Sequence, residues 1–146
     1  MIADVKEIVK IAELAGKAIL NIYDDPEKFG VTEKTDNSPL TLADTASNQV
    51  ICDGLKALYP HIPIISEENK SIPYHDRKGY DYFWLVDPLD GTKEFIKRNG
   101  DFTVNIALVK GQTPVMGVLH VPCEGKTYYA GGFNGGKTEK FIEMSF

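Results

Sequence analysis

Two stretches of the chain repeat apolar residues at steps of three and four, the spacing of one face of an α-helix. The first covers residues 3–23, and its stripe is formed by Val5, Ile8, Ala12, Ala15 and Ile19. The second covers residues 41–58, and its stripe is formed by Ala43, Ala46, Val50 and Ala57, joined by Ile51, Leu55 and Leu58. Each stripe predicts a helix that buries one face against a core.

The later part of the chain alternates apolar residues with smaller or polar ones, which is typical of a strand with two different faces. The alternation covers residues 102–108, and further strand-like segments follow at 115–121 and 126–130. A short apolar run at residues 62–65 predicts one more, buried strand. We therefore expect an α+β fold in which two N-terminal helices pack on one face of a mainly antiparallel sheet.

The predicted elements also set the expected domain limits. Residues 24–39 contain Pro26, Gly30 and Pro39 among polar residues, which indicates a loop. After Ala130 the pattern is lost. We expect one domain over residues 1–130 and an irregular tail over residues 131–146.

Composition narrows the class of protein. The 146 residues carry a net charge of −5, so a nucleic-acid binder with a basic face is not expected. No run approaches the roughly 18 apolar residues of a membrane span, and the N-terminus lacks the apolar core of a signal peptide. Cys52 and Cys123 are far apart and form no Cys-x-x-Cys motif. They indicate reduced thiols and a cytoplasmic protein.

The most informative stretch is residues 84–95, Trp-Leu-Val-Asp-Pro-Leu-Asp-Gly-Thr-Lys-Glu-Phe. Pro88 cannot donate to a sheet, so we expect the strand to end at Asp87 and a tight turn to lead to Asp90. Gly91 allows close approach of a ligand, and Thr92 can begin a helical turn whose free amides attract an anion. Carboxylates beside a carbonyl and a hydroxyl make a hard-oxygen site of the kind that Mg²⁺ favours.

Asp-Pro-Leu-Asp-Gly-Thr resembles the central motif of the lithium-sensitive, Mg²⁺-dependent phosphatases of the inositol monophosphatase superfamily. The continuation Lys93-Glu94-Phe95 resembles the branch of 3′(2′),5′-bisphosphate nucleotidases, enzymes of sulfur metabolism. The likeness runs from about residue 12 to about residue 130. It implies that the fold is the first half of the layered fold of this family.

The resemblance also implies roles for individual residues. The metal ligands would be Glu67, Asp87, the carbonyl of Leu89, and Asp90. Thr92, oriented by Asp44, would position the attacking water, and the substrate would meet Glu67 and the amides of Gly91 and Thr92. Secondary candidates are Glu68 as a supporting carboxylate, Lys34 as a phosphate contact and Asp36 as a ligand of a third metal.

Several of these acids have a second interpretation. Asp44 lies three residues after Thr41, so it could serve a capping-box variant with Thr41 as the N-cap. Glu67 and Glu68 follow a short strand, and such a pair is often only solvated. Lys34 and Asp36 could equally belong to a solvated loop.

The activity implied by the resemblance is Mg²⁺-dependent removal of the 3′-phosphate of adenosine 3′,5′-bisphosphate, which gives AMP. An inositol or sugar phosphate is an alternative substrate. Members of the family are about twice as long, and their second domain would bring a further metal-binding aspartate and most of the nucleoside pocket. That domain is expected to be absent here, so the chain could instead be a non-catalytic metal-binding or dimerisation fragment. Exposed apolar surface at the domain boundary would favour a homo-oligomer.

Overall fold

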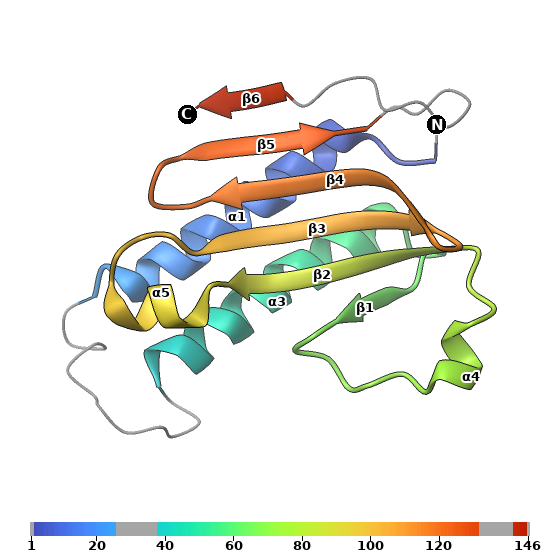
Figure 1. Cartoon of the computed structure of the whole chain (residues 1–146), viewed down its shortest axis with the longest axis horizontal. Coiled ribbons are helices and arrows are strands. Elements are labelled where there is room, and N and C mark those ends of the chain that lie inside the picture. Colours follow the sequence, from blue (N-terminus) through green and yellow to red (C-terminus); the bar gives the residue numbers. More distant parts are fainter. Residues whose placement is uncertain (1, 26–37, 132–141, 146) are drawn as a thin grey trace.

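The structure is a computed structural model that describes residues 2–25, 38–131 and 142–145. Its helices are α1 (Val5–Tyr23), α3 (Pro39–Leu58), α4 (Tyr74–Arg77) and α5 (Thr92–Lys97) (Figure 1). Its strands are β1 (Ile64–Ser66), β2 (Tyr82–Asp90), β3 (Thr103–Lys110), β4 (Thr113–Val121), β5 (Lys126–Ala130) and β6 (Ile142–Ser145).

The strands form one sheet in the order β1-β2-β3-β4-β5-β6, which is also their order in the sequence. The pair β1–β2 is parallel, and every other neighbouring pair is antiparallel. The predicted meander is therefore β3, β4 and β5. The expected α+β class, with a mainly antiparallel sheet, is confirmed.

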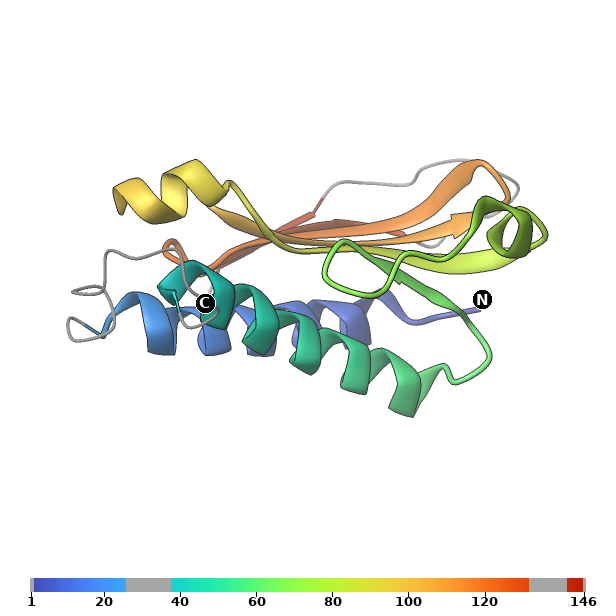
Figure 2. The same cartoon turned by 90° about the horizontal axis from the view of Figure 1, so that it is seen from below.

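Both long helices lie on the same side of the sheet (Figure 2). Helix α1 packs on β3, β4 and β5, whereas α3 packs on α1 and β2. The core between them is closed by fully buried side chains from both layers, among them Ile8, Ile19, Ile51, Leu55, Trp84, Val104, Ile106 and Leu108. On the opposite face of the sheet Leu85 is 49% exposed and Leu119 is 37% exposed. The sheet is thus well covered on one face only, within the part of the chain that is described.

The start of α3 differs from the prediction. The helix begins at Pro39, two residues earlier than expected, and its N-cap is Ser38, whose hydroxyl accepts from the Thr41 amide at 3.2 Å. Proline suits the first helical position and serine suits the cap, and this pair decides the start. The interpretation of Thr41 as the N-cap and of Asp44 as part of its capping box is therefore wrong. Asp44 lies beyond the first turn.

The tail also differs from the prediction of an irregular segment over residues 131–146. Residues 142–145 form β6, which pairs with β5 between Tyr129 and Lys126. The alternation Ile-Glu-Met-Ser is too short to predict a strand by itself. The strand depends on backbone pairing with β5, a non-local contact.

Two expectations about the whole chain can be compared with the described residues. No helix among them is long and apolar enough to span a membrane. Cys52 and Cys123 are both free thiols, the first buried and the second exposed.

Candidate functional site

A bulge in β2 brings Asp87 and Asp90 to the same face of the sheet. Asp87 lies opposite Asn105 and Asp90 lies opposite Thr103, with a register shift between them. Two residues of β2 therefore face one residue of β3. Since Asn105 and Thr103 are two residues apart and share a face, the two aspartates that oppose them share it too.

This bulge corrects the expectation that the strand ends at Asp87 in a tight turn. Strand β2 continues to Asp90, with Pro88 inside the bulge. Proline has no N–H to donate, and a bulge is where a sheet tolerates that loss. The carboxylate of Asp87 accepts a hydrogen bond from the Leu89 amide, and the Leu89 side chain is buried in the core.

Asn105 is a residue of this site that the sequence analysis missed. Its Nδ2 donates to Oδ2 of Asp90 at 3.1 Å, and the Thr103 hydroxyl donates to its Oδ1 at 3.4 Å. A polar residue in an alternating strand resembles any solvated position in sequence. The position of Asn105 opposite the bulge shows that its side chain orients the Asp90 carboxylate.

Gly91 turns the chain from β2 into α5, and the helical turn expected at Thr92 begins directly after it. Gly91 has φ +96° and ψ +53°, the left-handed region that favours glycine. A Cβ there would lie 3.2 Å from the Cα of Phe102. Thr92 is the first residue of α5 and is exposed beside this turn. A substitution at Gly91 would strain the turn that presents Thr92.

Glu67 reaches the same edge because β1 runs parallel to β2. Ser66 pairs with Val86, and the Glu67 amide donates to the Val86 carbonyl at 3.4 Å. Glu67 therefore follows β1 where Asp87 follows Val86 on the neighbouring strand. Both Glu67 and Glu68 are exposed.

Helix α3 supplies the inner wall of the site. Asp44 is half-buried on its second turn, and the buried Ser47 donates from its hydroxyl to the Pro88 carbonyl at 2.7 Å. Asn48 bonds Ser66 and Asn69 of the turn that carries Glu67. Ser47 and Asn48 were also missed. The signal for Ser47 was its position four residues from Ala43 and from Ile51, inside the buried stripe.

The electrostatics show that the acids converge. Burial first, then the carboxylates of Glu68, Asp87 and Glu67 in that order, together raise the pKa of Asp44 to about 7. Burial also raises the pKa of Asp87 to about 6, assisted by Glu67 and Asp90 and opposed by the Leu89 amide. Like charges at short range disfavour ionisation. Within the described segments no basic side chain is among the causes of either shift.

The geometry for a metal is incomplete in the described part of the chain. There, no three His, Cys, Asp or Glu side chains are arranged to hold an ion. No hydrogen bond joins Asp44 to Thr92 among these residues, although α3 contacts α5. Lys34 and Asp36 lie outside the described residues. The structure thus gathers five acids at the carboxyl ends of β1 and β2, beside Gly91 and Thr92: Asp44, Glu67, Glu68, Asp87 and Asp90. They do not form a closed set of metal ligands.

The sequence model of the inositol monophosphatase family matches residues 3–143. The chain belongs to this family. The family match covers both layers of the fold and all the acids described above. It also extends past Ala130, where we had expected the domain to end.

Relatives within the family are more specific. The chain is 48% identical, over 85% of its length, to a 3′(2′),5′-bisphosphate nucleotidase CysQ of Escherichia coli strain K12. A protein of the same name from Buchnera aphidicola is 44% identical over 92% of the chain. The chain covers 50% and 51% of these two proteins, so it spans about half the length of the curated relatives that it matches.

Solved structures of the family agree. The crystal structure of CysQ from Bacteroides thetaiotaomicron matches 97% of the chain at a TM-score of 0.84 and 45% identity, and 49% of that structure is covered. Inositol monophosphatase II of Staphylococcus aureus matches 91% of the chain at a TM-score of 0.72, with 48% of it covered. At 22% identity this second likeness shows the shared fold alone.

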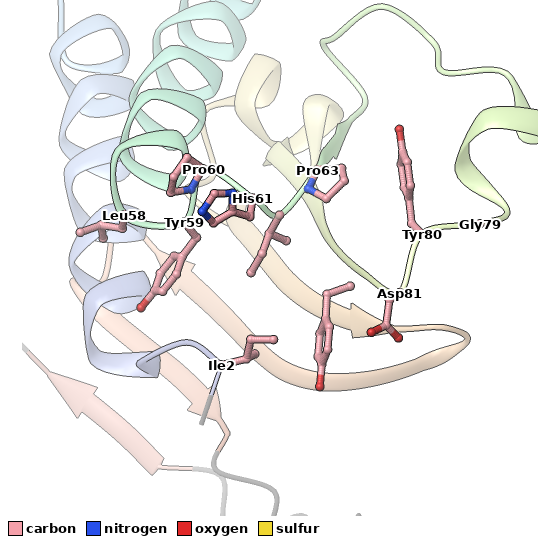
Figure 3. Close-up of a pocket in the computed structure, with 11 residues that line it drawn as sticks. Ile2, Leu58, Tyr59, Pro60, His61, Pro63, Gly79, Tyr80 and Asp81 are labelled. Atoms are coloured by element: carbon pink, nitrogen blue, oxygen red, sulfur yellow. The ribbon is translucent and has the colours of Figure 1, made fainter.

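A groove and a pocket lie near opposite ends of β1 and β2. A groove of about 370 Å³ begins at Glu67 and Asp87 and continues over Ala107 and Gly117 on the open face. A second pocket, of about 540 Å³, lies at the other end of β1 and β2 (Figure 3). It is lined by Tyr59, His61, Pro63, Tyr80 and Asp81 among others, and it contains none of the acids of the site. The acids, rather than the larger pocket, define the candidate site.

Proposed function

We propose that this chain carries the metal-binding and phosphate-binding residues of a phosphatase that removes the 3′-phosphate of adenosine 3′,5′-bisphosphate. The observation that carries the proposal is the convergence of Glu67, Asp87 and Asp90 at one sheet edge. The names of its relatives, which are 3′(2′),5′-bisphosphate nucleotidases, supply the substrate class. The product would be AMP.

The donors fit a hard divalent cation. Carboxylate oxygens and backbone carbonyls, of which we propose that of Leu89, are ligands that Mg²⁺ takes, and Mg²⁺ keeps several waters when a protein offers few carboxylates. Within the described residues, no basic side chain is among the causes of the pKa shifts of Asp44 and Asp87. A bound cation would therefore balance the negative charge of the site. When bound, Mg²⁺ would neutralise charge on the phosphate and act as a Lewis acid.

The residues of the chain would do the rest of the work. The Thr92 hydroxyl would hold the attacking water in line with the phosphate, and the half-buried Asp44 would fix that hydroxyl. The two side chains are not hydrogen-bonded in the structure, although α3 contacts α5, so the pair would form when metal and substrate bind. The amides of Gly91 and Thr92, with Glu67 opposite, would hold the substrate.

The Lys93-Glu94-Phe95 continuation favours a nucleoside bisphosphate over an inositol or sugar phosphate. We further propose that the substrate is a free small molecule, that nucleic acid is not bound, and that the protein acts in the cytoplasm. The acidic balance of −5 supports the second point.

The test measures phosphate release from adenosine 3′,5′-bisphosphate and from inositol 1-phosphate, with Mg²⁺ and with a chelator. Because the chain covers half of its relatives, it is assayed alone and co-expressed with the other half of the E. coli relative. We expect slow turnover alone, since three carboxylates make a partial cage, and faster turnover on complementation. The ratio of kcat/KM should favour adenosine 3′,5′-bisphosphate.

Asp87→Asn should abolish the activity in either preparation, with a loss greater than about 100-fold, since even residues behind the ligands cost 10–100-fold. The matched control is Asp81→Asn, an exposed aspartate at the other end of β2. Equal activity of Asp87→Asn and wild type would remove Asp87 from the site. Absence of Mg²⁺-dependent release in both preparations would overturn the proposed function.

A further inference from the structure

One turn of α3 contacts both segments that carry the acids. Ser47 follows Asp44 by three residues and Asn48 follows it by four, so all three side chains lie on one face of the helix. Ser47 is fully buried, and its hydroxyl donates to the Pro88 carbonyl at 2.7 Å. This bond ties α3 to the bulge between Asp87 and Asp90.

Asn48 makes the corresponding tie to the other segment. Its Oδ1 accepts from the Ser66 hydroxyl at 2.7 Å, and its Nδ2 donates to Oδ1 of Asn69 at 2.8 Å. The Asn69 amide in turn donates to the Ser66 carbonyl at 3.1 Å. The Ser66–Asn69 turn, which holds Glu67 and Glu68 between these bonds, is therefore closed from both ends by one side chain.

Both segments need such ties because their backbone links are weak. Pro88 has no N–H, and the bulge interrupts the ladder between β2 and β3. Among the backbone hydrogen bonds of the described residues, one long bond joins the turn after β1 to β2, from the Glu67 amide to the Val86 carbonyl at 3.4 Å. The acids also repel one another across this gap. Without side chains from α3, the repulsion would push the two segments apart.

We infer that Ser47 and Asn48 are positioning residues that set the spacing between the Asp87–Asp90 bulge and the Glu67 turn. They touch neither the substrate nor a metal in this assignment. They act through the carboxylates that they hold at a fixed separation. The effect on metal binding rests on the proposed function. The hydrogen bonds by which Ser47 and Asn48 join the two segments do not depend on it.

The experiment compares Ser47→Ala and Asn48→Ala with wild type. The matched control is Gln49→Ala, since Gln49 is the next residue of α3, is exposed and bonds only Asp53 of its own helix among the described hydrogen bonds. The first readout is backbone amide exchange in the metal-free protein. In Asn48→Ala, exchange at Glu67 and Asn69 should rise about tenfold or more, while the β3–β4 hairpin stays unchanged.

The second readout is the affinity for Mg²⁺ and for Mn²⁺, each added alone and followed by calorimetry. Both alanine variants should bind about 10–100-fold more weakly, the range known for residues that orient metal ligands. Gln49→Ala should bind as wild type does. A residue with a purely structural role would lower the melting temperature and speed exchange throughout, without this selective loss.

The outcomes separate the two proposals. Selective loosening of the Glu67 turn with weaker metal binding supports the positioning role. The positioning role is overturned when amide exchange in the variants is unchanged or rises equally throughout the sheet. It is also overturned when wild type binds Mg²⁺ and the alanine variants bind it with the same affinity. Should wild type bind no divalent cation, either alone or complemented with the other half of the E. coli relative, the proposed function fails, and amide exchange alone decides whether the tie exists.

Discussion

At the carboxyl ends of β1 and β2, acidic side chains gather around a bulge, whereas at their amino ends aromatic rings and prolines line a pocket. In the pocket the Tyr59 hydroxyl donates to Glu7 and accepts from the Asp4 amide, both at 2.8 Å. The acidic end has the opposite character, because its nearest charges are alike. Both ends belong to the same helix and the same strands.

The contrast separates groups that stabilise the fold from groups kept for chemistry. Packing and paired polar atoms stabilise the amino end. At the carboxyl end, the bulge and the crowded acids oppose folding, and α3 and α5 hold them in place. Functional sites commonly break local rules in this way and depend on the surrounding structure. The predictions below test that separation.

The largest expected effect comes from removing the anchor of α5. Phe95 is fully buried, with its ring 5.3 Å from that of Tyr23 and 5.2 Å from that of Phe102, centroid to centroid. Phe95→Ala should lower the free energy of unfolding by about 3–5 kcal/mol, the usual cost of truncating a buried phenylalanine. Urea denaturation measures the loss.

The control for this change is the next residue of the same helix. Ile96 is 60% exposed, so Ile96→Ala should change stability by less than about 0.5 kcal/mol. A loss below about 1 kcal/mol for Phe95→Ala would mean that the ring is not an anchor. The acidic end would then be held by α3 alone.

Much of the amino end and of the core could be predicted from the sequence, because its signals are local. The three-and-four spacing predicts α1 and α3, and Asp4 caps α1 just before its first turn. The alternation of Phe102, Val104 and Ile106 predicts β3 with its buried face. The bend at Gly91, which has φ +96°, also has a local signal, since a glycine stands directly between the strand and the helical turn that begins at Thr92. These features depend on neighbours within a few residues.

The carboxyl end could be predicted only in part, because its geometry depends on distant partners. The identities of Asp87 and Asp90 were clear, but their shared face depends on β3, which pairs with them across the bulge. Proline inside an apolar run was the available signal, since sheets accept it mainly at edges and bulges. Asn105 and Asn48 gave no signal, because a polar side chain that bonds a distant segment resembles a solvated one.

A smaller effect is expected at the amino end from Tyr59→Phe. The change removes a hydroxyl that serves both Glu7 and the amide at the N-cap of α1. We expect a loss of about 0.5–1.5 kcal/mol in the free energy of unfolding and no change in metal affinity. Thermal or urea denaturation and a Mg²⁺ titration measure the two quantities.

Tyr74→Phe is the matched control, since Tyr74 is 69% exposed. It should leave both the free energy of unfolding and metal affinity unchanged. Weaker Mg²⁺ binding by Tyr59→Phe would show that the two ends are coupled through α3. The contrast between a stabilising end and a chemical end would then be too simple.

The smallest expected effect is a gain in stability when Asp87 loses its charge. Burial first, then Glu67 and Asp90, raise the pKa of Asp87 from 3.8 to about 6. A carboxyl with a raised pKa binds its proton more tightly in the folded state, so its ionised form destabilises the fold above pH 6. Asp87→Asn should therefore raise the free energy of unfolding of the metal-free protein at neutral pH. The gain should be roughly 0.3–1 kcal/mol, because water screens a half-buried group.

The pH dependence of that gain identifies its cause. The difference between Asp87→Asn and wild type should be largest above about pH 6, shrink as the pH falls, and vanish below the unfolded pKa of 3.8. Denaturation in a chelating buffer at about pH 7.5 and about pH 4 measures it, with the exposed Asp81→Asn as a control that should show no difference at either pH. A variant less stable than wild type at neutral pH would contradict the prediction. In that case the hydrogen bond from the Leu89 amide to the Asp87 carboxylate would stabilise the fold more than repulsion from the neighbouring acids destabilises it. Asp87 would then stabilise the acidic end.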